Sequence, residues 1–410
     1  MANVSSSNGL EKRPKLRFPG FDEPWNTALL SDYFVKSTKK NSDGMISNVI
    51  CNSAKQGLIP QREYFDKDIA NSDNTNGYYI IESNDFVYNP RKSADAPYGP
   101  ISSYQYPEAG IVSPLYLCFR AKREINPLYF EWYFRSSTWH RYIYMSGDSG
   151  ARHDRVSIKD DVFFAMPINV PSAKEQEKIS LFLDVIERRI ETQRTLVETL
   201  KKYKRGVVRS LLSPEHCGLK EAQWQCDTIG NLGFFIKGAP LSKADISETG
   251  TPFILYGELY TTYHEVITSV VRKTEAVVEQ VHHSMVGDVL IPTSGETSEE
   301  ISTASCVMLP GVILAGDLNI FRSTKIDGRI MSYILNHIVN GNIARVAQGK
   351  SVVHVQASEI SKIKISYPDP ETQIRIIKIL EAIRNRIESC ENELNHLTKM
   401  RSSLLQQLFI

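Results

Sequence analysis

The stretch that decides the fold runs from residue 172 to residue 212 and has the sequence SAKEQEKISLFLDVIERRIETQRTLVETLKKYKRGVVRSLL. Apolar residues recur in it at alternating spacings of four and three, which is the heptad pattern of a helix that buries one stripe against another helix. The seam consists of Ile179, Leu183, Ile186, Ile190, Val197, Leu200, Val207 and Leu211, with Gln193 and Lys204 at the two remaining positions. We therefore predict one long helix with an apolar seam.

The same seam recurs 197 positions later. The second set is Ile376, Leu380, Ile383, Ile387, Leu394, Leu397, Leu404 and Leu408, with Cys390 and Arg401 at the positions that match Gln193 and Lys204. Because both interruptions recur, chance does not explain the match. The chain therefore contains an internal repeat.

The starts of the two helices also agree. Ser172 and Glu175 form a predicted capping box, in which the hydroxyl accepts from a first-turn N–H and the carboxylate returns to the cap. Asp369 takes the cap position of the second helix, and Pro370 follows where its missing N–H costs nothing. Ser213-Pro214 ends the first helix.

A stretch of short β-like runs and one amphipathic helix precedes each long helix. The first half has predicted strands at 78–81, 86–88, 111–119 and 162–168 and a helix at 128–143. The second half has predicted strands at 253–256, 266–271, 289–291, 307–314 and 363–367 and a helix at 329–346. The predicted parts are a flexible tail (1–17), a mixed domain (18–171), a spacer helix (172–213), a second domain (214–369) and a second spacer helix (370–410).

The predicted fold class is α+β, with two mixed α/β domains separated by a two-helix coiled coil within one chain. Neither long helix is stable alone, so the simplest solution packs the two seams together. A parallel pair would bring both domains to one end, whereas an antiparallel pair would hold them at opposite ends, related by a pseudo-two-fold axis. We favour the antiparallel arrangement because the chain then crosses back only once.

The distribution of charge is more informative than the net charge of +1, which is unlike an independent DNA-binding protein. Residues 172–212 hold 10 basic and 6 acidic side chains, whereas residues 18–171 hold 16 and 18 and residues 213–370 hold 12 and 17. Any nucleic acid must therefore be held by local patches or together with partner subunits.

The six cysteines show no C-x-x-C pair, which predicts neither a zinc site nor a disulfide framework. No run approaches 18 apolar residues and no apolar leader is present, so we expect a cytoplasmic protein without a membrane span. The sequence also shows no nucleophile elbow, metalloprotease motif or Gly-rich cofactor turn. We therefore expect no catalysis by this chain alone.

At this point the sequence resembles the specificity subunit, HsdS, of type I restriction-modification enzymes over nearly the whole chain. The resemblance lies in the Pro-x-x-x-x-Gln openings at 171–176 and 368–373 and in LRFPGF at 16–21 before Trp25. Further similar stretches are the Gly-rich basic loops at 147–155 and 349–354, ILYGELY at 254–260 and GDVLI at 287–291.

The resemblance implies two target-recognition domains, each recognising one half of a bipartite sequence in double-stranded DNA. It implies that the helices set the half-site spacing and dock two methyltransferase subunits, with motor-nuclease subunits joining for cleavage. No cofactor is expected in this chain, and S-adenosylmethionine, ATP and magnesium belong to the partner subunits. The alternative from another class is a coiled-coil scaffold for protein interactions without DNA specificity, and a weaker third option is a stand-alone nuclease.

Candidate DNA contacts in the first half lie in two loops. The turn Tyr88-Asn89-Pro90-Arg91-Lys92 combines an aromatic ring, an amide and two cations, which can stack on bases and bind purine edges. An ordinary polar turn is the alternative. The candidates in the Gly-rich loop are Arg152, His153 and Arg155.

Candidate contacts in the second half include the loop at 349–354, where Lys350 and Ser351 could contact a phosphate or a base edge. A simple solvated loop remains the alternative. A nucleotide-binding P-loop is disfavoured because residue 344 is Ala and a β-like run follows. The predicted contacts of this half are Lys237, Lys243, Tyr256, Ser294, Lys350, Ser351 and His354.

Overall fold

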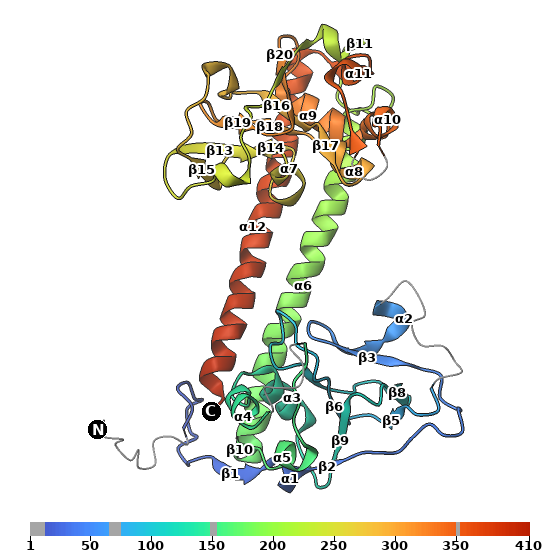
Figure 1. The fold of residues 1–410 in the computed structure, drawn as a ribbon, viewed down its shortest axis with the longest axis vertical. Helices are drawn as coiled ribbons and strands as arrows, with labels where there is room; N and C mark the ends of the chain where they lie inside the picture. Colours follow the sequence, from blue (N-terminus) through green and yellow to red (C-terminus); the bar gives the residue numbers. More distant parts are fainter. Residues whose placement is uncertain (1–12, 65–74, 148–153, 350–352) are drawn as a thin grey trace. The chain divides into compact units, whose positions relative to one another are not determined.

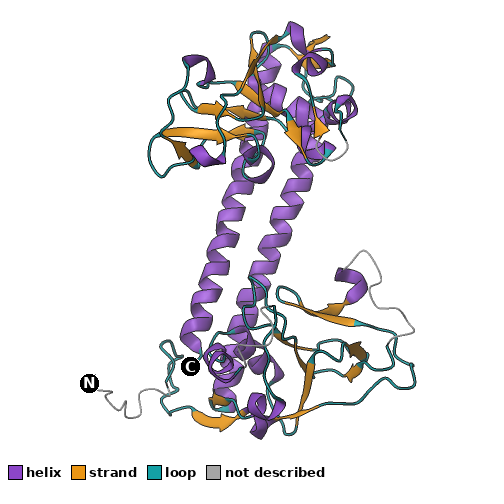
Figure 2. Ribbon diagram, in the orientation of Figure 1, coloured by secondary structure: helices purple, strands orange, loops and turns teal. Residues whose placement is uncertain are grey.

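The computed structural model describes residues 13–64, 75–147, 154–349 and 353–410 (Figure 1). The chain divides into two compact units, one made of residues 1–193 with 393–410 and the other of residues 194–392. Two long helices, α6 (Ala173–Leu211) and α12 (Pro370–Leu408), each contribute to both units. Helices and strands mix in both units (Figure 2), which confirms the predicted fold class.

The first unit is built on a four-stranded sheet in the order β2-β9-β6-β7. Two-stranded pairs β1·β10, β3·β4 and β5·β8 accompany it. The strands are β1 (Asn26–Leu29), β2 (Phe34–Lys36), β3 (Ile50–Ser53), β4 (Gly57–Pro60), β5 (Tyr79–Ile81), β6 (Phe86–Tyr88), β7 (Ile101–Ser103), β8 (Gly110–Val112), β9 (Leu117–Ala121) and β10 (Pro167–Val170). The short helices are α1 (Leu30–Tyr33), α2 (Gln61–Tyr64), α3 (Pro127–Arg135), α4 (His140–Ser146) and α5 (Asp160–Phe164).

The second unit is built on a five-stranded sheet in the order β12-β20-β16-β18-β14, with a three-stranded sheet β15-β13-β19 and pairs β11·β22 and β17·β21. The strands are β11 (Trp224–Thr228), β12 (Gly233–Lys237), β13 (Thr251–Leu255), β14 (Val266–Ile267), β15 (Arg272–Thr274), β16 (Asp288–Pro292), β17 (Ser294–Gly295), β18 (Ser305–Val307), β19 (Ile313–Ala315), β20 (Leu318–Ser323), β21 (Val353–His354) and β22 (Lys364–Pro368). The short helices are α7 (Glu258–Thr261), α8 (Ser298–Ile301), α9 (Gly328–His337), α10 (Asn340–Val346) and α11 (Ala357–Ser361).

The two units repeat one plan, which confirms the internal repeat. Antiparallel β1·β10 corresponds to β11·β22, and the central pair β6·β9 corresponds to β16·β20. Helices α3, α4 and α5 likewise correspond in order to α9, α10 and α11. The second unit differs mainly by its added sheet β15-β13-β19.

Several predicted elements are shorter in the structure than expected. The predicted helix 128–143 is divided into α3 and α4, because the Ser136 hydroxyl donates to the Tyr133 carbonyl and the chain turns there. The predicted helix 329–346 is divided into α9 and α10. The predicted strand 162–168 begins as helix α5, strands 111–119 and 307–314 each split in two, and strand 266–271 ends at Ile267.

The two long helices run antiparallel, as their ion pairs within each unit show. In the first unit Arg401 lies 2.7 Å from Glu187, and Arg189 pairs with Glu393. In the second unit Lys201 lies 2.8 Å from Glu391. Residue numbers rise along one helix as they fall along the other, so the antiparallel prediction is confirmed.

Most of the predicted seam is buried. Near the helix ends, however, the buried positions shift by one residue from the predicted ones, and we call this shift the drift of the seam. Ile179, Leu183, Ile186, Ile190 and Val197 are buried, as are Ile376, Leu380, Ile387 and Leu408. In the last turns of α6, however, Val208 and Leu212 are buried in place of the predicted Val207 and Leu211, which are half-buried with Leu200. Half-buried seam positions on α12 are Ile383, Leu394, Leu397 and Leu404.

The drift has a packing cause, since the helix ends belong to the cores of the globular parts. Val208 and Leu212 pack in one cluster with Ile229 and Leu232 of the second unit. Leu408 and Phe409 pack in the aromatic cluster of the first unit. A helix end that enters a globular core follows its natural period of 3.6 residues rather than the 3.5 of a coiled coil.

The cations that interrupt the two seams are both held by carboxylates. Lys204 lies 2.6 Å from Glu265, which also accepts a hydrogen bond from His337 at 2.8 Å. Burial disfavours ionisation of Glu265, but the His337 hydrogen bond and the Lys204 charge outweigh it and hold the pKa of Glu265 below its usual value. Arg401 pairs with Glu187 on the other helix. Both cationic interruptions of the seams are therefore held in ion pairs.

The two helix starts share a side-chain link to the preceding strand. Gln176 donates to the carbonyl of Pro171 at 2.9 Å, and Gln373 donates to the carbonyl of Pro368 at 2.8 Å. This link explains the repeated Pro-x-x-x-x-Gln spacing. At the second start, the Thr372 hydroxyl donates to Asp369, and together with backbone N–H donors it lowers the pKa of Asp369 to about 2.

The predicted capping box at the first helix start is only half formed. Ser172 accepts from the Glu175 N–H at 3.4 Å, but the Glu175 carboxylate pairs with Arg17 at 2.7 and 2.8 Å instead of returning to the cap. Leu16 also donates its N–H to the Gln407 carbonyl. The described end of the predicted flexible tail is therefore attached to the first unit.

Gly206 lies inside α6 with open space around it. A methyl group added there meets nothing within 4 Å. We expect Gly206→Ala to raise the free energy of unfolding by about 0.5–1 kcal/mol, because glycine in a helix interior costs that much relative to alanine. Urea denaturation followed by circular dichroism measures the change, and a loss of stability would show that close packing requires the glycine.

Candidate nucleic-acid interface

In the first unit the structure brings together the two loops that the sequence singled out. The Lys92 N–H donates to the Asp154 carbonyl at 2.9 Å, and the Val156 N–H donates to the Pro90 carbonyl at 2.8 Å. Arg91 and Arg155 form an antiparallel β-bridge between these bonds. Two cation-bearing loops that lie more than 60 residues apart in the sequence are therefore joined through their backbones at the end of β6.

The turn after β6 is fixed by close backbone packing. Gly99 has φ +82°, and a Cβ at that position would lie 2.1 Å from the Asn89 carbonyl oxygen. The Asn89 N–H donates to the Pro100 carbonyl at 3.0 Å. A rigid turn presents its side chains at small entropic cost, which suits recognition.

The second unit joins its candidates in the same way. β17 pairs with β21, which places Ser294 opposite His354. β17 follows β16 just as the Asn89–Lys92 turn follows β6, so the two junctions occupy equivalent places in the repeat. The sequence predicted both junctions as contact loops but did not predict that each forms by pairing.

Three of the predicted contacts are buried in the structure. Tyr88 is 2% exposed, donates its hydroxyl to the Tyr98 carbonyl and stacks on Phe163, so its ring is not free to stack on a base. Asn89 is buried and holds the turn through the Arg91 N–H. Ser294 is buried and donates to Asp317 at 2.8 Å.

The other predicted contacts differ in the solvent exposure of their side chains and in the bonds that hold them. Arg91, Lys92, Lys243 and His354 are exposed, and Arg155 is half-buried. Lys237 is exposed but donates to Asn319 at 3.1 Å. Tyr256 is half-buried against the apolar cluster around Ile254. The predicted contacts Arg152, His153, Lys350 and Ser351 lie outside the described residues.

An ion pair with a buried carboxylate lies at the start of the strand that leads to each junction. Arg120 donates to both carboxylate oxygens of Asp85 at 2.6 and 2.7 Å, and Arg322 donates to both of Asp288 at 2.9 and 2.8 Å. The carboxylates are almost fully buried, and their hydrogen bonds raise the pKa of both arginines. These pairs tie β6 to β9 and β16 to β20.

Sequence reasoning missed these four residues. Asp85 and Asp288 are 203 positions apart and Arg120 and Arg322 are 202 apart, close to the 197 of the helix repeat. Matching the two halves residue by residue would have found them. They hold neighbouring strands of each sheet together.

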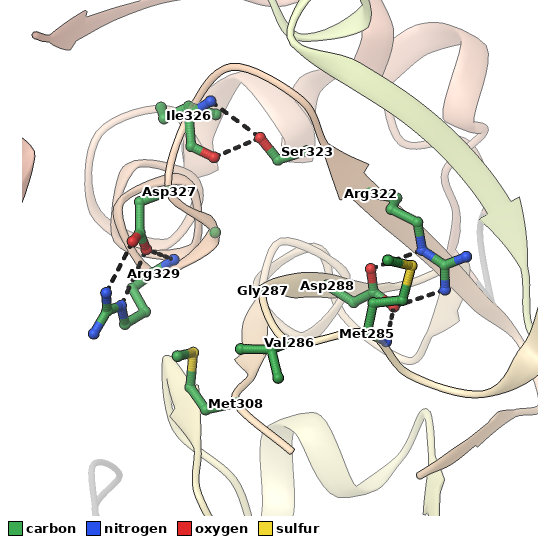
Figure 3. A pocket seen from close by; sticks show the side chains of 11 residues that line it. Met285, Val286, Gly287, Asp288, Met308, Arg322, Ser323, Ile326, Asp327 and Arg329 are labelled. Atoms are coloured by element: carbon green, nitrogen blue, oxygen red, sulfur yellow. Dashed lines mark hydrogen bonds and ion pairs between the residues drawn. The ribbon is translucent and has the colours of Figure 1, made fainter. Parts of the chain in front are cut away.

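A cavity of about 320 Å³ lies beside the second pair, between the turn before β16 and the start of α9 (Figure 3). Arg322 faces Asp288 on one side of it, and Arg329 faces Asp327 on the other (Figure 3). Arg329 also donates to Glu381 of α12 at 2.8 Å. Both arginines are thus committed to carboxylates, so the cavity is a joint between sheet and helix rather than an anion site.

The described residues contain no cluster of three or more His, Cys, Asp or Glu side chains able to hold a metal ion. Within the same residues no helix is both long and apolar enough to cross a membrane. The two junctions are thus polar and cationic surface features of a mixed scaffold.

Comparison with known proteins shows which class of protein this chain is similar to. Residues 221–399 match the family model described as the type I restriction modification DNA specificity domain. A curated relative from Methanocaldococcus jannaschii, named as the type I restriction enzyme MjaX specificity subunit, is 24% identical over 305 residues, which cover 70% of this chain and 68% of the relative.

Solved structures share the fold at 15% sequence identity. A chain from a structure of a type I restriction-modification system, described for its complex assembly and conformational transition, matches with a TM-score of 0.60 and covers 95% of this chain and 98% of its own length. The type I restriction-modification S subunit from M. genitalium matches with a TM-score of 0.56 over 97% and 99%.

The chain therefore carries a DNA specificity domain. Along most of its length the chain is similar to specificity subunits of type I restriction-modification systems. The comparisons bear out the expected resemblance and the expected class of function.

Proposed function

We propose that each globular part recognises one half of a bipartite DNA target and that α6 and α12 set the distance between the halves. The observation that carries the proposal is the repeated unit, in which equivalent junctions follow β6 and β16 and equivalent helix starts follow β10 and β22. A repeated scaffold with divergent surface residues suits two different half-sites. The domain boundaries 18–171 and 214–369 remain part of this proposal.

Apolar side chains exposed on both long helices support docking of two methyltransferase subunits. Leu181, Phe182 and Val185 are exposed on α6, and Ile374 and Ile379 are exposed on α12. Phe182 and Ile379 are matching positions of the 197-residue repeat. An exposed apolar patch on each long helix, with this one position shared, suits two copies of one subunit. Motor-nuclease subunits, with S-adenosylmethionine, ATP and magnesium in the partner subunits and a cytoplasmic location, complete the proposed assembly.

Footprinting of the chain assembled with its methyltransferase partner tests the proposal. Two short protected half-sites that flank an unrecognised gap are expected. One continuous footprint would contradict the bipartite arrangement, and the absence of any footprint would favour a protein-interaction scaffold. The chain alone, incubated with DNA and S-adenosylmethionine, should transfer no methyl group.

Arg91→Ala tests the junction of the first unit. We expect a loss of about 1–3 kcal/mol in binding of the target duplex, confined to one half-site, because a bidentate arginine contact to guanine contributes about that much discrimination. Binding titrations against duplexes with single substitutions measure it, and Lys39→Ala, on the same unit beside Glu82, is the control. An unchanged affinity and preference would remove Arg91 from the interface.

A further inference from the structure

A row of exposed cations follows one face of α6 near its end. Lys202, Arg205 and Arg209 are spaced by three and four residues, which places them on one helix face together with Gly206. All four residues are exposed. We call these four residues the basic stripe.

The basic stripe is distinct from the other cations at this helix end. Lys201 pairs with Glu391 and Lys204 pairs with Glu265. The three cations of the stripe form no ion pair with any residue in the described parts of the chain, and Glu198, one turn before Lys202, forms none with it. The stripe therefore presents free positive charge.

The helix dipole does not account for the stripe. The negative end of a helix favours cations only within the last turn. α6 ends at Leu211, so Arg209 lies in that turn, but Lys202 and Arg205 lie one to two turns earlier. A different cause is needed for these two.

The packing of α6 against α12 does not require the basic stripe either. The matching positions of the second repeat are Lys399, Ser402, Ser403 and Gln406, which carry one cation where α6 carries three. The antiparallel pairing is present along both helices, whereas the stripe is present on one. It is a feature of the second unit alone.

The composition of the stripe favours phosphate over a protein surface. The buried centre of a protein interface is organised around apolar, aromatic and arginine anchors, and the stripe has no apolar or aromatic member to accompany its two arginines. Tyr203 is the large exposed side chain of this stretch, but at 100° per residue it lies on another face from Lys202. Phosphate contacts need only charge and hydrogen-bond donors.

Gly206 adds room for close approach. No described atom lies within 4 Å of where its Cβ would be, so the helix backbone is uncovered between Arg205 and Arg209. A phosphate can therefore approach the helix between the two guanidinium groups.

The stripe also belongs to the same packed body as the junction of the second unit. Val208 and Leu212 of α6 pack in one cluster with Ile301 of α8 and Val355, which follows β21. The helix end and the β17·β21 junction are therefore held on one core.

We propose that the basic stripe binds the phosphate backbone of the DNA beside the half-site recognised by the second unit. The contact adds affinity without adding sequence information. The proposal rests on the proposed function, because it requires DNA at the second unit. It also accounts for DNA binding by a chain whose second globular part holds more acidic than basic side chains.

The test compares the assembled complex with a variant in which Lys202, Arg205 and Arg209 are all replaced by Gln. Duplexes with the target and with a scrambled sequence are titrated at several salt concentrations. We expect the slope of log K against log salt to fall by about two to three, since each phosphate contact contributes about 0.9. Affinity should fall by the same factor for both duplexes, so the specificity ratio is unchanged.

Lys399→Gln, at the position that matches Lys202 but without neighbouring cations, is the matched control and should leave the slope unchanged. Circular dichroism establishes that the triple variant keeps its helix. An unchanged slope in the triple variant, with sequence preference intact, overturns this inference and leaves the proposed function standing. Loss of methyltransferase assembly with an unchanged slope overturns it in favour of a protein contact. A wild-type complex that shows no sequence preference contradicts the proposed function itself.

Discussion

Replacing Leu380 with Asp is expected to unfold the second unit and to abolish assembly with partner subunits. Leu380 is fully buried, in one cluster with Ile376, Val208 and Leu212. The substitution removes a core side chain, at about 2–5 kcal/mol, and buries a carboxylate without a partner, at a further several kcal/mol. The sum is comparable with the whole stability of a domain, which is about 5–15 kcal/mol. Thermal denaturation and size-exclusion chromatography measure the outcome.

Two control variants separate the effect of burying a charge from the effect of changing the side chain or of adding a charge elsewhere on α12. Leu380→Met keeps the volume and should cost less than about 1.5 kcal/mol. Asn385→Asp places the same charge on an exposed position of α12 and should change stability by less than about 0.5 kcal/mol. A Leu380→Asp protein with normal melting and normal assembly would show that the seam does not carry the fold.

Inserting one heptad into both long helices is expected to change the half-site spacing and not the half-sites. Facing insertion points lie between Thr195 and Leu196 on α6 and between Glu391 and Asn392 on α12, since Arg189 with Glu393 and Lys201 with Glu391 bracket this register. Seven residues add about 10 Å of helix, which lengthens the preferred gap by up to about 3 base pairs. Binding to the native spacing should then be lost, because the half-sites no longer match in distance and phase.

Selection from duplexes with randomised gaps measures the preferred spacing. An insertion in α6 alone is the control, because it breaks the facing register of the seams and should destabilise the helix pair instead of lengthening it. A doubly lengthened protein that keeps the native spacing would contradict the proposed role of the helices.

The sequence predicted the long helices well because their signal is periodic and repeated. Ile179, Leu183, Ile376 and Leu380 are all fully buried, and the departures from the heptad lie near the C-terminal ends of both helices, where Val208 and Leu405 are buried in place of Val207 and Leu404. The departure in α6 depends on Val208 entering the core of the globular part, which no local pattern encodes. Periodicity identifies which face of a helix is buried, but it does not show whether the other helix or a globular core covers that face.

The candidate interface was less predictable for a related reason. The sequence located the loops that meet after β6, but it could not separate Arg91, which is exposed, from Tyr88, which is core. Aromatic and amide side chains serve both roles, and tertiary packing decides between them. The ion pairs of Asp85 with Arg120 and Asp288 with Arg322 join strands distant in sequence, so only the fold brings the partners together.

The contact between Leu16 and Gln407 has a counterpart in the second unit. In the first unit the segment entering β1 meets the end of α12. In the second unit the continuous stretch between α6 and β11 makes the corresponding link. The same joint between a helix end and the start of a unit is therefore made by a hydrogen bond in the first unit and by the chain itself in the second.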